Sequence, residues 1–353
     1  MSSSKNIPLR LTELDGLRGV MAIFVVFYHL DDTNFISLIN DSFLVRNSGY
    51  FVDFFFVMSG FVICLNYETK VLSVKHFMIK RLKRLYPMLF FSTTLYLLFK
   101  IIVWLFTSDI VSTSKPFIQS YLNTVLLLNS TSLLSEKIAE HGMNFPTWSI
   151  SGEMFSYLIF ALITKYFRGI TQPIIVLFSL LASSIILFKM NAYLDPNISF
   201  IRAWICFSSG YFVFKINRKS NIKTSSLVAI VMILGLFFLL DHTESPMLEL
   251  LLVPTIFSAA LFFIINDKGR LPKILKNKVF SFLGSISYSL YVNHALFLAV
   301  IPYVFFNVTN LQRNLTTLFL CGITIVITSI AWSVLTRKYV ENILKKQRSS
   351  HKN

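Results

Sequence analysis

The sequence predicts an all-α membrane protein that crosses the bilayer about ten times. The chain of 353 residues is 54% hydrophobic, contains 36 phenylalanines and has a mean hydropathy of +0.65. A soluble domain of this size does not need so much apolar surface. Charged residues make up only 14% of the chain, and they gather between long apolar runs instead of scattering. Together these observations predict a polytopic helical membrane protein.

Each long apolar run is interpreted as one transmembrane helix. The expected spans are residues 17–36, 50–66, 86–106, 147–165, 170–189, 199–216, 225–240, 247–265, 284–306 and 314–336. The apolar part of the first span is too short to cross alone, so this helix either continues towards Ile39 or enters at a tilt. The shorter run Tyr121–Leu128 is expected to be re-entrant or interfacial. Residues 1–340 are therefore expected to form a single domain, and residues 341–353 a basic cytoplasmic tail.

The loops alternate in charge. Lysine and arginine concentrate after the second, sixth and eighth expected spans and in the tail, whereas aspartate and glutamate dominate the opposite loops. By the positive-inside rule both termini are cytoplasmic, which agrees with an even number of spans. A net charge of +16 can indicate nucleic-acid binding, but this distribution favours membrane topology and no nucleic-acid partner. We expect a multi-pass protein of the inner (cytoplasmic) membrane, in contact with membrane lipid.

Two polar residues of the first span, Arg18 and His29, are the strongest functional signal. Eleven helical steps of about 100° come to about 1100°, within about 20° of three full turns, so a helix places both on one face. The helical rise separates them by about 16 Å, about half of a bilayer core. Charged and titratable groups are costly at such depths, and they are functional candidates by default. The alternatives are a snorkelling anchor for Arg18 and an interhelical hydrogen bond for His29.

Two carboxylates are expected in the same outer half of the membrane as His29. Asp53 lies among phenylalanines at the start of the second span, and Glu153 lies near the start of the fourth. A carboxylate that holds the tautomer of a histidine and stabilises its cationic form makes a general base. We therefore expect Asp53 or Glu153 to orient His29, the alternative being a structural polar network.

Two arginines open the third span on the cytoplasmic side. Arg81 and Arg84 are three residues apart and are expected on one helix face, where guanidinium groups can bind phosphates bidentately. Together with Arg18 they predict an anion site at the inner surface. The alternative is a purely topological role or contact with anionic lipid.

The ninth span carries a polar stripe. Ser287, Tyr291 and His294 recur at spacings of four and three, so one helix face presents all of them. Such a stripe is expected to line a cavity, or else to bond neighbouring helices. Arg202, at the outer start of the sixth span, is a cation that the positive-inside rule does not explain.

Five motifs in register resemble the acyltransferase 3 family of integral membrane acyltransferases. The matching segments are Leu14–Gly19 with Tyr28–His29, Val52–Phe61, Arg81–Pro87, Trp148–Glu153 and Ser287–His294. The resemblance covers essentially the whole chain. Two positions depart from the family pattern, because Asn293 stands where an aromatic residue is frequent and Ala295 where proline is frequent.

The resemblance implies a ten-span enzyme that takes an acyl group, commonly acetyl, from cytoplasmic acyl-CoA. The acceptor it implies is a hydroxyl of a surface carbohydrate such as lipopolysaccharide O-antigen, capsule or exopolysaccharide, with the carbohydrate in some cases lipid-linked. It also implies catalysis by His29 and donor binding by Arg18, Arg81 and Arg84. We add Trp148, Ser287, Tyr291 and His294 as expected substrate-binding residues. No bound cofactor or metal is expected, because Cys64, Cys206 and Cys321 lie inside apolar runs without paired spacing.

The expected mechanism is direct acyl transfer with His29 as general base, and Ser287 or Tyr291 near the oxyanion. A route through an acyl-histidine stays open. Intramembrane charges fit a transporter of a glycan or small anion nearly as well, although we find no clear inverted repeat. A structural scaffold of a polysaccharide assembly complex is the third interpretation.

Overall fold

The computed structural model describes residues 11–31, 42–67, 73–107, 117–131, 142–220, 222–243 and 245–341. Across these ranges helices are joined by turns and short loops, and an isolated β-bridge links Thr224 and Asp267. The longer helices are α1 (Thr12–Asp31), α4 (Phe51–Tyr67), α5 (Val74–Thr107), α7 (Trp148–Tyr166), α8 (Thr171–Met190), α9 (Ser199–Lys219), α10 (Ser226–Asp241), α11 (Pro246–Asn266), α13 (Lys278–Tyr303) and α14 (Leu315–Thr336). The shorter ones are α3 (Phe43–Arg46), α6 (Phe117–Val125) and α12 (Arg270–Leu275), with 3₁₀ turns at Ser48–Tyr50, Phe145–Thr147 and Pro196–Ile198 and π turns at Val304–Val308 and Arg337–Glu341.

A helix lies at the position of every expected span, which confirms the all-α class for the described residues. Six stretches are long and apolar enough to cross a membrane, namely Phe43–Tyr67, Val74–Phe106, Thr171–Met190, Pro246–Asn266, Lys278–Val308 and Leu315–Glu341. The total of about ten spans and the cytoplasmic termini stay predictions. Several bounds differ from expectation, since α1 begins at Thr12 and α5 at Val74, and the continuation of the first span beyond Asp31 lies outside the described residues.

The early start of α5 has a local explanation. The sequence prediction began this span at residue 86, next to Pro87, yet the helix runs through that proline from Val74. Proline is tolerated inside membrane helices because neighbouring groups satisfy the freed carbonyl. The first part of the run Tyr121–Leu128, expected to be re-entrant or interfacial, lies in α6, a nine-residue helix. Its Tyr121 hydroxyl lies 3.0 Å from Thr94 Oγ1 of α5.

Side-chain caps fix where several helices begin. Asn277 accepts a hydrogen bond from the Phe280 amide at the start of α13, and Asn314 forms a capping box with Thr317 at the start of α14. Such caps satisfy amides that the first helical turn leaves without partners. The polar residues between apolar runs therefore define the beginnings of α13 and α14.

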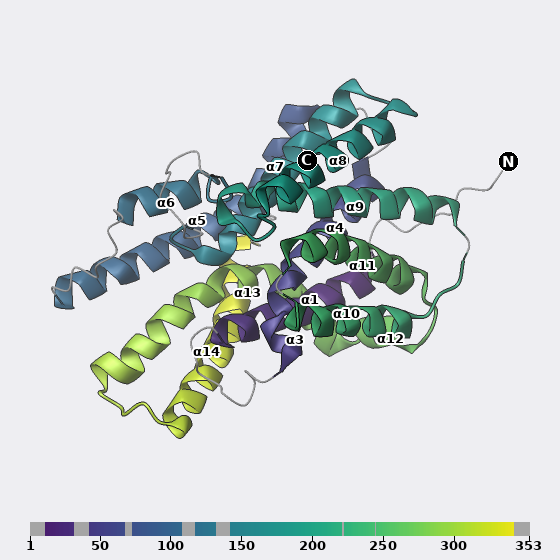
Figure 1. The fold of residues 1–353 in the computed structure, drawn as a ribbon. Helices are drawn as coiled ribbons and strands as arrows, with labels where there is room; N and C mark the ends of the chain where they lie inside the picture. The colour runs from purple at the N-terminus through teal and green to yellow at the C-terminus, as the bar shows by residue number, and fades with distance from the viewer. Residues whose placement is uncertain are drawn as a thin grey trace, which may run out of the picture.

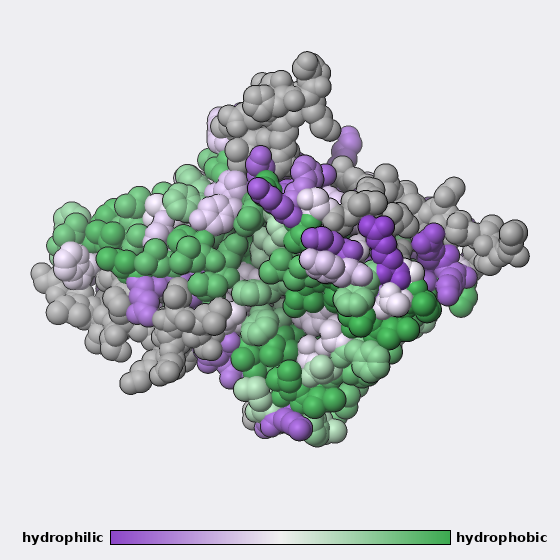
Figure 2. Space-filling view, turned by 90° about the horizontal axis from the view of Figure 1, so that it is seen from above, coloured by the Kyte–Doolittle hydropathy of each residue, from purple (hydrophilic) through white to green (hydrophobic). Residues whose placement is uncertain are grey.

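The other helices are arranged around α1. Figure 1 shows α1 in the middle, with α13 and α14 on one side, α10, α11 and α12 on the other, and α5 and α6 extending as an arm. The most extensive packing pairs are α1 with α13, α4 with α9, and α13 with α14. Among the six candidate spans, that of α4 is the most enclosed and α8 the least. Broad apolar areas cover the surface in Figure 2, as expected of helices that face lipid.

Helices α1 and α13 approach closely because glycines lie between them. A Cβ atom at Gly19 would come 2.4 Å from the Gly284 amide nitrogen, and a Cβ at Gly284 would come 2.1 Å from the Asp15 carbonyl oxygen. Gly19 and Gly284 meet near one end of the pair, and His29 and His294 meet ten positions further along both helices. The two helices are therefore parallel, and small residues at the contact let their backbones touch.

We expect Gly284→Ala to separate α1 from α13, because no flexible side chain can yield to the new methyl group. The predicted loss is about 1–3 kcal/mol of unfolding free energy, measured by thermal unfolding in detergent micelles. The matched control is Gly235→Ala in α10, where a Cβ meets nothing within 4 Å. It should leave stability unchanged or raise it by about 0.5–1 kcal/mol. Equal effects of the two substitutions would contradict the packing described here.

Candidate active site

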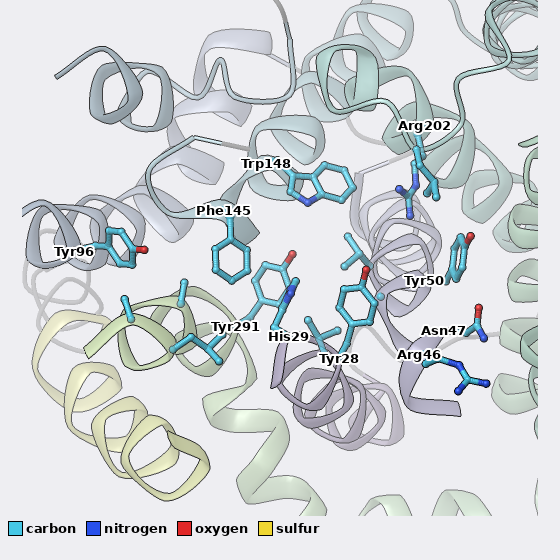
Figure 3. Close-up of a pocket in the computed structure, with 17 residues that line it drawn as sticks. Tyr28, His29, Arg46, Asn47, Tyr50, Tyr96, Phe145, Trp148, Arg202 and Tyr291 are labelled. Carbon is cyan, nitrogen blue, oxygen red and sulfur yellow. The ribbon is translucent and has the colours of Figure 1, made fainter. Parts of the chain in front are cut away.

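A cavity of about 750 Å³ lies where α1, α13, α7 and α9 come together. Its wall includes His29 of α1, Tyr291 of α13, Trp148 of α7 and Arg202 of α9. Figure 3 shows His29 near the middle of the cavity, with Phe145 and Tyr96 towards one end and Tyr50, Asn47 and Arg46 towards the other. Residues of four helices that are distant in the sequence therefore meet at one cavity.

Aromatic rings surround the imidazole of His29. Its ring centroid lies 4.6 Å from that of Phe145 and 4.9 Å from that of Tyr28, both in edge-on geometry. The ring of His294 stacks on it at 5.2 Å with an interplanar angle of 21°. This packing holds the His29 ring at the cavity wall, where a bound molecule can reach it.

The polar stripe of the ninth expected span is only partly directed at the cavity. Tyr291 lines it, donates a hydrogen bond to the Pro146 carbonyl at 2.9 Å and lies 2.8 Å from Ser149 Oγ. His294 is fully buried behind the His29 ring, with Nδ1 at 3.3 Å from the Leu290 carbonyl. Among the described residues, His294 Nε2 has no hydrogen-bond partner. Ser287 donates to the Gly284 carbonyl within its own helix at 2.9 Å.

Asp53 has a partner that the sequence interpretation did not assign. Both of its oxygens bind the Arg202 guanidinium, with Nε at 2.7 Å from Oδ1 and a second, shorter contact to Oδ2. Tyr193 donates to the same carboxylate at 3.3 Å, and Asp53 is fully buried. The lone carboxylate and the unexplained cation of the sequence are thus one ion pair between α4 and α9. The sequence did offer a signal for this pair, because Asp53 and Arg202 are isolated charges of opposite sign within apolar spans.

Glu153 lies deeper in α7 than Trp148, about 7 Å further along the helix axis. Its Oε1 accepts hydrogen bonds from Ser59 Oγ at 2.6 Å and from the Tyr157 hydroxyl. It is also within electrostatic range of Arg18. Glu153 therefore lies between the cavity and the arginines of the opposite side.

Arg18 and Arg84 come together as the sequence interpretation expected. Arg18 is half-buried, lies 3.6 Å from Asp15 and is within electrostatic range of Arg84. Arg84 is exposed, and it is also within electrostatic range of Tyr288 of α13. These residues form a basic cluster that gathers side chains from α1, α5 and α13.

Arg81 does not share an exposed face with Arg84, which corrects the expected pairing. It is 9% exposed, and its guanidinium donates to the Tyr67 hydroxyl at 2.7 Å. The rings of Tyr67, Phe77 and Tyr157 lie 5.1, 5.4 and 5.9 Å from its Cζ atom. A three-residue separation turns the second side chain by about 60°, and packing against α7 buries only the first. Arg81 is therefore enclosed by aromatic rings, whereas Arg84 is open to a ligand.

These features define a helical membrane protein with an imidazole at a cavity wall and, earlier on the same helix, an arginine that joins a basic cluster. The family model for the Acyltransferase domain (acyltransferase 3) matches residues 11–336, so the chain belongs to this family. A protein named "Putative acetyltransferase ORF330" from Acidianus two-tailed virus is 24% identical over 304 residues, which cover 83% of this chain and 84% of the relative. No solved structure matches the chain. The family resemblance expected from the sequence is thereby confirmed.

We expect Asp53→Asn to destabilise the protein because it leaves the Arg202 guanidinium buried without a counter-charge. The predicted loss is about 3–5 kcal/mol, measured as unfolding free energy in detergent micelles. The double variant Asp53→Leu/Arg202→Met removes both charges and should recover most of that loss.

The matched control for this pair is Asp241→Asn. It breaks the Arg46–Asp241 ion pair, whose arginine is 43% exposed, and should cost about 0–1 kcal/mol. An Asp53→Asn protein as stable as the Asp241→Asn protein would mean that the Asp53–Arg202 pair does not hold α4 against α9.

Proposed function

We propose that this protein transfers an acyl group, commonly acetyl, from cytoplasmic acyl-CoA to a hydroxyl of a surface carbohydrate. One observation carries the proposal: His29 lines the cavity while Arg18, eleven residues earlier on α1, joins Arg84 in a basic cluster. Helical rise separates the two positions by about 16 Å. One helix therefore links the proposed anion site to an imidazole at the cavity wall.

The basic cluster is the proposed donor site. Arg18 and Arg84 bind the phosphates of acyl-CoA through charge-assisted hydrogen bonds, which arginine makes bidentately. Arg81, whose guanidinium is bound by the Tyr67 hydroxyl, adds a buried positive charge three residues before Arg84 on α5. From there the pantetheine arm runs along α1, and its thioester reaches His29. Family membership supports acyl transfer, and the identity of the donor is part of the proposal.

The chemistry proposed at the cavity is general-base catalysis. His29 takes the proton of an acceptor hydroxyl as its oxygen attacks the thioester carbonyl carbon. The new C–O bond forms, the C–S bond breaks, and the sulfur of CoA leaves with the electron pair of that bond. The imidazolium then returns the proton to the departing thiolate. The stacked ring of His294 and the edge-on ring of Phe145 hold the imidazole in place during these steps.

The carboxylates have separate roles in this proposal. Asp53 fixes Arg202 at the cavity wall, and Glu153 lies on the donor side with Ser59 and Tyr157. Neither is needed as the direct partner of the His29 ring. The acceptor sugar lies against Trp148 and Tyr291, whose rings give the cavity flat apolar faces next to His29. Ser287, which bonds its own helix, has no assigned part in this binding.

We expect His29→Ala to lower acyl transfer by about 10²–10⁴-fold, the usual contribution of a general base. The measurement is transfer of label from radioactive acetyl-CoA to the glycan fraction of the host, catalysed by membranes that contain either protein. The matched control is His242→Ala, which removes an exposed histidine at the end of α10. Label in glycan with both variants would remove His29 from the mechanism. Uptake of a glycan or anion without acyl-CoA would favour a transporter.

We expect Arg84→Ala to raise KM for acetyl-CoA by about 10–100-fold, because it removes hydrogen bonds to charged phosphate oxygens. At saturating donor, kcat should change little. The control is Lys83→Ala, which removes the exposed cation next in the chain. If both variants raised KM equally, general attraction to the basic surface would replace a specific donor site.

A further inference from the structure

The lining of the cavity differs in chemistry on the two sides of His29. In Figure 3, Arg46, Asn47, Tyr50 and Arg202 lie on one side of His29, and Phe145 and Tyr96 lie on the other. We call the first group the polar compartment. It offers guanidinium, amide and phenol groups to a bound molecule.

The second compartment is lined mainly by apolar side chains, and we call it the apolar compartment. Its residues are Phe145, Ala295, Leu298 and Ala299, with the ring of Tyr96 at its far end. Phe145 and Leu298 also belong to the apolar cluster that joins α1, α13 and α14. A sugar here would find the Tyr96 hydroxyl and leave most of its own hydroxyls without hydrogen-bond partners, which is costly.

We propose that the apolar compartment binds the acyl chain of the donor and admits chains longer than acetyl. This inference rests on the proposed function. The acyl chain is the part of the two substrates without polar groups, so it alone gains from this lining. The reacting carbonyl must lie at His29, where the acceptor hydroxyl meets it. With the acceptor in the polar compartment, the acyl chain extends from His29 into the apolar compartment.

Two small residues give this compartment its width. Ala295 and Ala299 are four residues apart on α13, so they lie on one face and follow Tyr291 towards the end of the helix. Leu298 narrows the space beside them. A larger residue at position 299 should therefore shorten the compartment, and a smaller one at position 298 should lengthen it.

The test compares acetyl-, butyryl- and hexanoyl-CoA as donors to the same glycan fraction, with kcat/KM as the readout. The wild type should use butyryl-CoA at least as well as acetyl-CoA. Ala299→Leu should lower the ratio of kcat/KM for butyryl-CoA to kcat/KM for acetyl-CoA by about tenfold or more. Leu298→Ala should act in the opposite direction and favour hexanoyl-CoA. Ala331→Leu, an equal substitution at an exposed position of α14, is the control.

The other outcomes separate this inference from the proposed function. A wild type that transfers only acetyl, or an Ala299→Leu protein that loses acetyl and butyryl transfer alike, overturns the inference and leaves the acyltransferase intact. An unchanged preference among donors with a raised KM for the acceptor would assign the compartment to the acceptor instead. No transfer from any donor by the wild type would overturn both.

Discussion

The close contact of α1 with α13 is the constraint on which the site depends. Gly19 and Gly284 let the two parallel backbones touch, and this contact sets the register of both helices. Ten positions further along, the same register places His29 against His294. Because both helices are stiff, a displacement at the glycines would be transmitted to the imidazoles. Helix packing thus determines the geometry of the candidate base.

Charge pairing is the second organising feature, since an unpaired charge is costly inside a membrane. Asp53 and Arg202 neutralise each other beside the cavity, and Arg46 does the same with Asp241. At the other end of α1 the arrangement is different, because Arg84 stays exposed near Arg18. The arginines beside the cavity are therefore held in ion pairs, whereas the basic cluster at the other end of α1 presents the guanidinium of Arg84 to a ligand.

The sequence predicted which residues line the cavity better than it predicted their partners. His29, Trp148 and Tyr291 were expected from motif and spacing, and all three lie on its wall. Asp53 or Glu153 was expected to orient His29, with a structural polar network as the alternative. Asp53 instead binds Arg202, which is 149 residues distant in the sequence. A hydropathy pattern gives the depth of a residue in the bilayer, but not the neighbouring helix that it faces. The hydropathy pattern therefore could not predict that α4 pairs with α9.

By itself the sequence determined the all-α class, the positions of the apolar helices and the membership in an acyltransferase family. The class and the helix positions follow from local composition and periodicity, on which helix formation and burial in lipid depend, and the family follows from the resemblance of five short motifs. Only the tertiary structure decided that Arg81 is enclosed by aromatic rings while Arg84 is exposed, and that His294 stacks on His29. Those relations depend on side-chain packing between helices that are distant in the chain, and no local pattern encodes them.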